Sequence, residues 1–128
     1  MNSGPAVRET FSKDDRLRKR REFEECYASG VRVSGRHIQV FLLAENRPGR
    51  PRLGVSVPRR VGSAVARNRA RRRLREIFRR SRALLPGTAP AIRIVVNVRP
   101  SASAAPFSEL AEDYRTAVTR ALSRLPRP

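Results

Sequence analysis

The chain has 128 residues, a size typical of one domain, and its 29 lysine and arginine residues outnumber 11 acidic ones to give a net charge of +18. A folded protein with this excess repels itself, so we expect a polyanion as its partner. No apolar run is long enough to cross a membrane, the first residues lack the apolar core of a signal peptide, and a single cysteine, Cys26, excludes an internal disulfide. These features predict a cytoplasmic protein, and one cysteine with one histidine cannot form a Cys/His metal cluster.

A short helix is the first predicted element, after a flexible N-terminal tail of residues 1–14. The helix is expected over residues 18–29 and ends before Gly30, a residue that commonly follows a helix. Phe23 and Tyr27 are four residues apart and therefore share one face of this helix.

Four segments alternate between apolar and other residues, as β-strands with one buried face do. They cover residues 31–34, 36–45, 52–57 and 91–98. In the longer three, one face is strongly apolar and carries Ile38, Val40, Leu42, Leu53, Val55, Val57, Ile92, Ile94, Val96 and Val98. The other face is mixed, with Phe41, Arg93 and Asn97 among its residues, so it is left for the first helix or for a ligand.

Two longer helices, over residues 63–85 and 107–125, need an apolar face to cover. The order of elements is then α-β-β-β-α-β-α. This order predicts an α/β fold, a two-layer sandwich with a four-stranded sheet. It forms a single domain of residues 15–125, followed by a C-terminal tail of residues 126–128.

The helix of residues 63–85 contains the sequence ARNRARRRLREIFRR, in which eight of fifteen residues are arginine and Glu76 is the only acid. At 100° per residue, Ala70, Leu74, Ile77 and Phe78 fall within one stripe, so one seam anchors the helix to the core. A DNA-reading helix-turn-helix would not follow three strands, and a membrane helix would need the apolar stripe exposed. Structured RNA, which is read through shape and phosphates, fits best.

The segment ARNRARRRLRE, preceded by RLGVSVPRRVGSAV, resembles the RNR signature of the bacterial ribonuclease P protein family. RLRKRREFEECYASG, SGRHIQVFLL and IVVNVRP resemble the first helix, the following strand and the last strand of that family, so the resemblance covers residues 17–114. It implies a left-handed crossover around the arginine-rich helix, which ordinary chirality rules do not predict.

The same resemblance implies a holoenzyme subunit with no catalytic residue of its own. It would bind a catalytic RNA and the 5′ leader of precursor tRNA, and assist endonucleolytic removal of the leader to give the mature tRNA 5′ end. The RNA would carry the active site and its Mg²⁺ ions, with no metal or other cofactor held tightly by the protein. A monomer bound one to one to the RNA is expected.

Two RNA-binding surfaces are implied. The catalytic RNA is expected to contact Arg59, Arg60, Arg67, Asn68, Arg69, Arg71, Arg72, Arg73 and Arg75. The leader is expected in a cleft between the first helix and the mixed sheet face, lined by Phe23, Tyr27, Phe41, Arg93 and Arg99. Aromatic rings and arginines in a groove suit single-stranded RNA, because bases stack on the rings and phosphates pair with guanidinium groups.

Alternatives stay open at this point. Phe23 and Tyr27 could be ordinary core residues of the first helix, and Asn68 could be structural rather than a contact to RNA or a metal-bound water. Composition alone also fits a ribosomal protein or a general RNA-binding module. A nuclease in its own right is disfavoured, because the strands carry only one carboxylate, Glu45, at a strand end.

Overall fold

A four-stranded sheet lies at the centre of the computed structural model, which describes residues 11–126. The strands are β1 (Val31–Ser34), β2 (Ile38–Ala44), β3 (Arg52–Ser56) and β4 (Ile92–Val98). They lie in the order β1-β2-β4-β3. Strand β2 is antiparallel to both of its neighbours, β1 and β4, whereas β3 is parallel to β4. The four predicted strands are therefore confirmed, with ends that differ by at most two residues.

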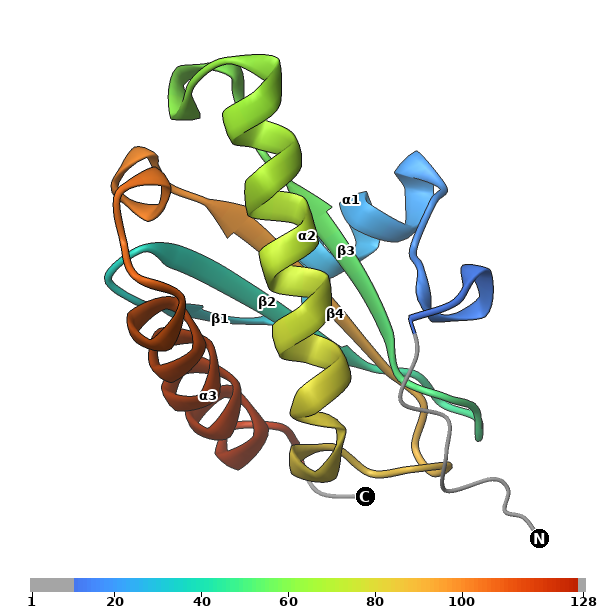
Figure 1. Cartoon of the computed structure of the whole chain (residues 1–128). Helices are drawn as coiled ribbons and strands as arrows, with labels where there is room; N and C mark the ends of the chain where they lie inside the picture. The colour runs from blue at the N-terminus through green and yellow to red at the C-terminus, as the bar shows by residue number, and fades with distance from the viewer. Residues whose placement is uncertain (1–10, 127–128) are drawn as a thin grey trace, which may run out of the picture.

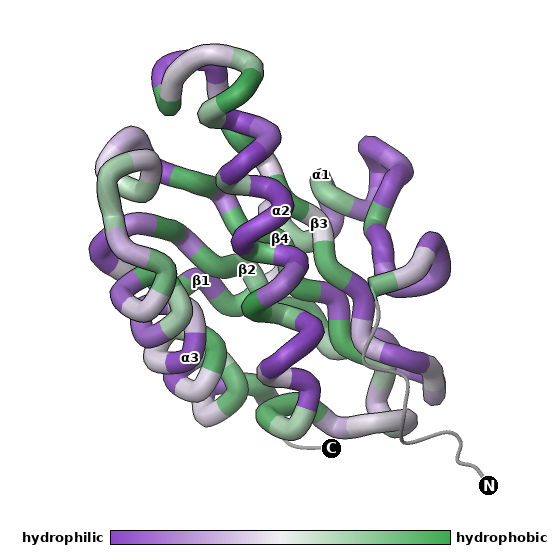
Figure 2. Tube along the Cα trace, in the orientation of Figure 1, coloured by the Kyte–Doolittle hydropathy of each residue, from purple (hydrophilic) through white to green (hydrophobic). Residues whose placement is uncertain are grey.

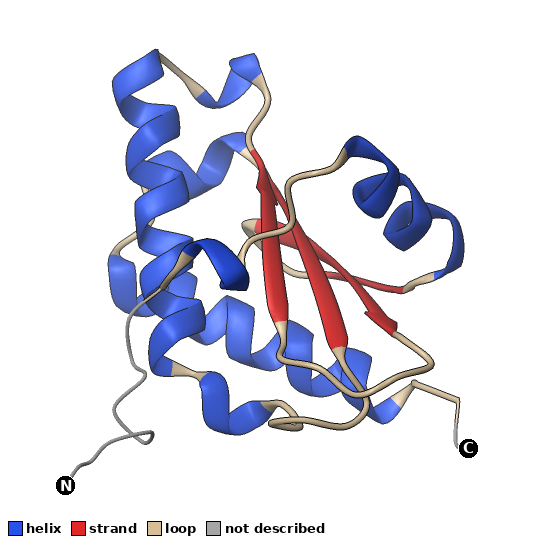
Figure 3. Cartoon of the chain, turned by 90° about the vertical axis from the view of Figure 1, so that its right-hand side faces the viewer, coloured by secondary structure: helices blue, strands red, loops and turns tan. Residues whose placement is uncertain are grey.

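Three α-helices surround the sheet: α1 (Arg20–Ser29), α2 (Ala64–Arg80) and α3 (Phe107–Ser123). Helices α2 and α3 cover one face and α1 lies on the other (Figures 1 and 3). The α/β architecture and the element order are as predicted, and α1 adds a short third layer over part of the mixed face. Helix α2 ends five residues earlier than expected: Ser81 leaves the helical conformation, and a short 3-10 helix of Arg82–Leu84 follows. Leu85 then adopts the extended conformation that is usual before a proline.

The connection from β3 through α2 to β4 is the unusual part of the topology. In Figure 1, α2 passes in front of the sheet, both strands point upward, and β4 lies to the left of β3. This arrangement is the left-handed crossover that the family resemblance implied, opposite to the usual hand of such units.

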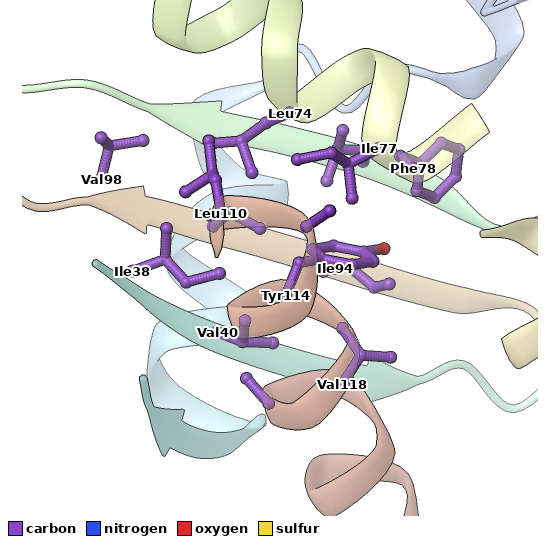
Figure 4. Close-up of a cluster of buried hydrophobic side chains, with 14 of the residues drawn as sticks. Ile38, Val40, Leu74, Ile77, Phe78, Ile94, Val98, Leu110, Tyr114 and Val118 are labelled. Atoms are coloured by element: carbon purple, nitrogen blue, oxygen red, sulfur yellow. The ribbon is translucent and has the colours of Figure 1, made fainter. Parts of the chain in front are cut away.

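The main core lies between the sheet and helices α2 and α3 (Figure 4). Its side chains come from the predicted apolar faces of the strands and from the predicted stripe of α2, where Ala70, Leu74, Ile77 and Phe78 are buried. Full burial of a large apolar side chain stabilises a fold by roughly 1.5–3 kcal/mol. One seam is therefore enough to anchor α2 and to leave the rest of its circumference at the surface.

A smaller core lies on the opposite face, between the sheet and α1. It contains Leu17, Cys26, Phe41 and Val95, with Phe23 and Leu43 packed at its edge. Gly54 allows α1 to approach, because a Cβ at this position would lie 2.5 Å from Phe23 Cζ. Burial raises the pKa of the Cys26 thiol to about 11, so this cysteine acts as a small packed side chain.

Within the described residues, the segment from residue 11 to the start of α1 packs against the body of the protein. The ring of Phe11 meets Phe78 edge to face at 5.7 Å between centroids. The buried carboxylate of Asp15 pairs with Arg50 at 2.5 Å and with Arg82 at 2.9 Å. Residues 1–10 of the predicted N-terminal tail, and residues 127–128 of the C-terminal one, lie outside the described residues.

Candidate nucleic-acid interface

Helix α2 presents a cationic surface on the side away from its core seam. Ser63 caps the helix by accepting a hydrogen bond from the Ala66 backbone N–H at 3.2 Å. Seven of the residues expected to contact the catalytic RNA lie on α2 and two lie in the short 3-10 helix before it, and all nine are exposed or half-buried: Arg67, Asn68, Arg69, Arg71, Arg72, Arg73 and Arg75 on α2, and Arg59 and Arg60 before it. In Figure 2 the outward parts of α2 are strongly hydrophilic, while its inner stripe joins the apolar strands.

Some of these side chains are already held by the protein. Arg73 donates a hydrogen bond to the carbonyl of Ala105 at 2.7 Å and lies over the ring of Phe107. Burial, together with the charge of Arg69, lowers the pKa of Arg73. These contacts fix the direction of the guanidinium group before any RNA arrives.

Asn68 has an intrahelical partner, because its Oδ1 accepts a hydrogen bond from Arg71 at 2.9 Å. Within residues 11–126 its amide nitrogen donates to no other group. Beside it, the Nε atom of Arg67 is buried without a hydrogen-bond partner in the described part of the chain. The structure therefore supports a structural role for the Asn68 oxygen and leaves the amide nitrogen of this exposed residue for a ligand.

Acidic side chains offset the arginine charge only at the C-terminal end of α2. Glu76 pairs with Arg79 and Arg80, and their hydrogen bonds and charges lower its pKa to about 2. Arg69 and Arg72, nearer the N-terminus, are exposed and have no acidic partner among residues 11–126. The uncompensated positive charge thus belongs to the first two-thirds of the helix.

A second candidate surface is an open groove at the end of α1. Tyr27, on α1, meets the buried ring of Phe41 edge to face at 4.8 Å, and its hydroxyl donates to Asn97 Oδ1 at 2.9 Å. Asn97 lines a groove of about 500 Å³ on the mixed sheet face. The lining residues are Gln39, Ser56, Pro58, Arg60, Asn97, Val98, Arg99 and Pro100. Tyr27 is 40% exposed and is bonded to a lining residue, so part of its side chain is open to solvent at the border of this groove.

Of the five residues predicted for the leader cleft, only Arg99 lines this groove, and Tyr27 lies at its border. The other three lie elsewhere, and Phe41 is buried in the small core below α1. Arg93 shares the face of β4 with Arg99, but its guanidinium donates to Glu25 at 2.6 Å and to Glu45 at 3.1 Å. It holds α1 to the opposite end of the sheet instead of lining the groove, and these contacts raise its pKa despite its burial. Phe23 is half-buried against Gly54, so core packing accounts for it.

The groove also contains residues that the sequence did not assign to it. Gln39, Asn97 and Ser56 lie side by side across β2, β4 and β3 in the sheet register. The alternation of residues along each strand places all three side chains on the mixed face, but the sequence does not show that β3 pairs with β4. Arg60, expected at the catalytic-RNA surface, lines the groove as well and so connects the two surfaces.

The ribonuclease P family model matches residues 11–122, almost the whole described chain. The chain belongs to the ribonuclease P protein family. A ribonuclease P protein component from Acidothermus cellulolyticus is 46% identical over 101 residues, covering 77% of this chain and 81% of that protein. Another, from Kocuria rhizophila, is 37% identical over 110 residues and covers 85% of this chain and 93% of that one.

Solved ribonuclease P proteins share the fold. The Staphylococcus aureus protein aligns with a TM-score of 0.75 at 27% identity, over 85% of this chain and 96% of that one. The Thermotoga maritima protein aligns with a TM-score of 0.71 at 30% identity, over 82% and 96%. The chain is thus a subunit of the ribonuclease P endoribonuclease, with a role in tRNA 5′ processing, and the ribonuclease P RNA is its partner.

The described part of the chain contains no cluster of side chains suited to holding a metal ion. Among residues 11–126, no three histidine, cysteine or acidic side chains come together as a metal site would require. Glu22 and Glu45 are paired with Arg52. His37 is buried, with Nδ1 2.8 Å from the Ser101 hydroxyl and Nε2 against Glu109, which makes it a structural residue. No helix of the described chain is both long and apolar enough to span a bilayer.

Proposed function

We propose that helix α2 docks on the catalytic RNA while the groove beside Tyr27 receives the 5′ leader of precursor tRNA. The observation that carries this proposal is the pair of distinct surfaces joined at Arg60. One is a convex helix with uncompensated arginines, and the other is a concave groove with an exposed aromatic edge. A convex cationic helix suits the phosphates of folded RNA, whereas a groove with a ring suits an unpaired strand.

Three groups would act on the leader. The Tyr27 ring offers a surface for stacking, Arg60 and Arg99 offer charge for phosphates, and the amides of Gln39 and Asn97 offer hydrogen bonds to base edges. Arg93 is omitted, since two carboxylates hold it. By binding the leader, the protein would hold precursor tRNA in preference to the mature product.

The donor set does not fit a Mg²⁺ ion held by the protein. No carboxylate is among the residues that line the groove beside Tyr27, and Glu76, the acid of α2, is engaged by Arg79 and Arg80. Mg²⁺ prefers oxygen ligands that are not so neutralised. We therefore assign the Mg²⁺ ions to the RNA subunit, to which one protein monomer would bind in the cytoplasm.

The experiment is precursor tRNA processing at low Mg²⁺ with catalytic RNA, with and without the protein. We expect the protein to restore cleavage that the RNA performs poorly alone, because its positive charge offsets repulsion between the two RNAs. Purified protein, freed of RNA by nuclease treatment, should not cleave. Cleavage by the protein alone, or no effect of the protein on the RNA, would contradict the proposal.

A further inference from the structure

A larger groove lies at the other end of α1, away from the proposed leader site. It has a volume of about 690 Å³ and is formed by the segment before α1, the start of α1 and the loop between β2 and β3. Its lining contains seven basic and three acidic side chains: Lys13, Arg16, Arg18, Lys19, Arg47, Arg50, Arg52, Asp14, Glu22 and Glu45. Figure 2 shows the hydrophilic segment before α1 at the right of the view.

Two of the three acids of this groove, Glu22 and Glu45, are paired with arginines, whereas Asp14 is exposed beside Lys13 and pairs with none of the lining cations. Arg52 pairs with Glu22 at 2.9 Å and with Glu45 at 3.2 Å, and Arg47 also pairs with Glu45. On the rim, Lys13, Arg18 and Lys19 are exposed and have no acidic partner within residues 11–126. Three cations without an acidic partner and one acid, Asp14, therefore stand in one short segment, which keeps a net positive charge along the edge of a concave surface.

The rim is continuous with the cationic face of α2. Arg16, before α1, and Arg75, on α2, both lie 5.8 Å from the centroid of the Phe11 ring. Burial lowers the pKa of Arg75, and so does the positive charge of Arg16. Two guanidinium groups that repel each other across one ring would be stabilised by an anion bound near both.

The leader groove is a separate site. Arg52, at the start of β3, lines the present groove, whereas Ser56, at the end of β3, lines the groove beside Tyr27. Helix α1 packs on this face of the sheet (Figure 3). Glu22 in its first turn lines the present groove, whereas Tyr27 near its end contacts the other, and the two grooves share no lining residue. RNA bound in the groove beside Tyr27 therefore does not by itself contact the present groove.

We propose that this groove binds the sugar–phosphate backbone of a further RNA strand, with Lys13, Arg18 and Lys19 on its phosphates. The strand continues from the RNA held on α2, past Arg16 and Phe11, into the groove. It comes either from the catalytic RNA or from precursor tRNA, which offer the same phosphate chemistry. The inference rests on the proposed function, since it takes its ligand from the same holoenzyme.

The test compares two double variants that each remove two positive charges from neighbouring positions. Arg18→Ala with Lys19→Ala removes charge from the rim of the groove, while Arg20→Ala with Arg21→Ala removes it from exposed residues outside the lining. Affinity is measured against salt concentration for catalytic RNA alone, and for precursor and mature tRNA with the reconstituted holoenzyme. Circular dichroism checks the fold, and the charge-preserving pair Arg18→Lys with Lys19→Arg should retain binding.

For the rim variant, we expect the slope of log affinity against log salt to fall by roughly one per residue removed. A fall with catalytic RNA alone assigns the strand to that RNA, and a fall confined to tRNA binding by the holoenzyme assigns it to the substrate. Unchanged slopes in every titration, or an equal fall for the Arg20 and Arg21 variant, would overturn the inference. The double variant Arg67→Ala with Arg69→Ala serves as the reference. If this variant alone weakens RNA binding, the inference about the groove is wrong and the proposed function stands. If this variant has no effect either, the proposed function fails.

Discussion

Replacing Tyr27 with alanine should separate leader binding from folding. The ring is 40% exposed at the border of the groove, so its loss removes a stacking surface and leaves most of the core of α1 intact. Stacking of a base on an aromatic side chain is worth about 1–3 kcal/mol. We therefore expect affinity for precursor tRNA to fall about 5- to 150-fold, since each 1.4 kcal/mol is a factor of ten.

The same variant also has a cost in stability that can be worked from its two contacts. The edge-to-face contact with Phe41 is worth about 0.5–1.5 kcal/mol, and the hydrogen bond to Asn97 contributes a further 0.5–1.5 kcal/mol or so. Tyr27→Phe is the matched control, because it keeps the ring and loses only the hydroxyl. It should lose stability but hold the leader almost as well as the original protein.

The assay measures equilibrium binding of precursor and mature tRNA to holoenzyme reconstituted with each variant, with thermal unfolding followed by circular dichroism. Mature tRNA has no leader, so its affinity should not change for Tyr27→Ala. Equal losses for both tRNAs would refute the reasoning, because they would show that the ring supports the fold of α1 and not a leader site.

Three further predictions concern the helix, the N-terminal segment and the contact below α1. Arg67→Ala with Arg69→Ala should weaken assembly with the catalytic RNA at an unchanged unfolding temperature; a loss of stability without a loss of affinity would make both residues structural. Burial alone would raise the pKa of Asp15, but hydrogen bonds from Arg82 and the Ser12 backbone, with the charges of Arg82 and Arg50, hold this pKa below the ordinary value of an aspartate. The ionised carboxylate therefore stabilises the fold above about pH 4, and this stabilisation is lost as the pH falls further. Asp15→Asn should lower the free energy of unfolding by about 3 kcal/mol at neutral pH, and the variant should lose less further stability in acid than the original protein does. Denaturant titrations at several pH values measure both effects. Gly54→Ala should destabilise the protein by about 1–3 kcal/mol through a clash with Phe23, whereas Gly87→Ala, with open space around it, should not; equal unfolding temperatures would contradict the close approach of α1.

The helices and strands could be predicted from the sequence because each depends on a pattern of residues within its own segment. Alternation in β2 and β4 separated the face of Ile38 and Ile94 from the face of Phe41 and Val95, and each face packs as expected. The 3.6-residue repeat in α2 likewise identified the buried seam and left the arginines outside it. These patterns depend only on backbone geometry and on the burial of apolar side chains, so a single sequence is enough to read them.

Partners far apart in the chain were decided only by the tertiary structure. Arg93 and Arg99 have the same parity on one strand, but Glu25, 68 residues away, meets Arg93 because α1 crosses the sheet at that end. Arg60 lines the leader groove because β3 joins β4 across the crossover, a pairing that alternation does not specify. An ion pair or a groove depends on which segments become neighbours, and that choice is made by the packing of the whole chain, not by the sequence around each residue.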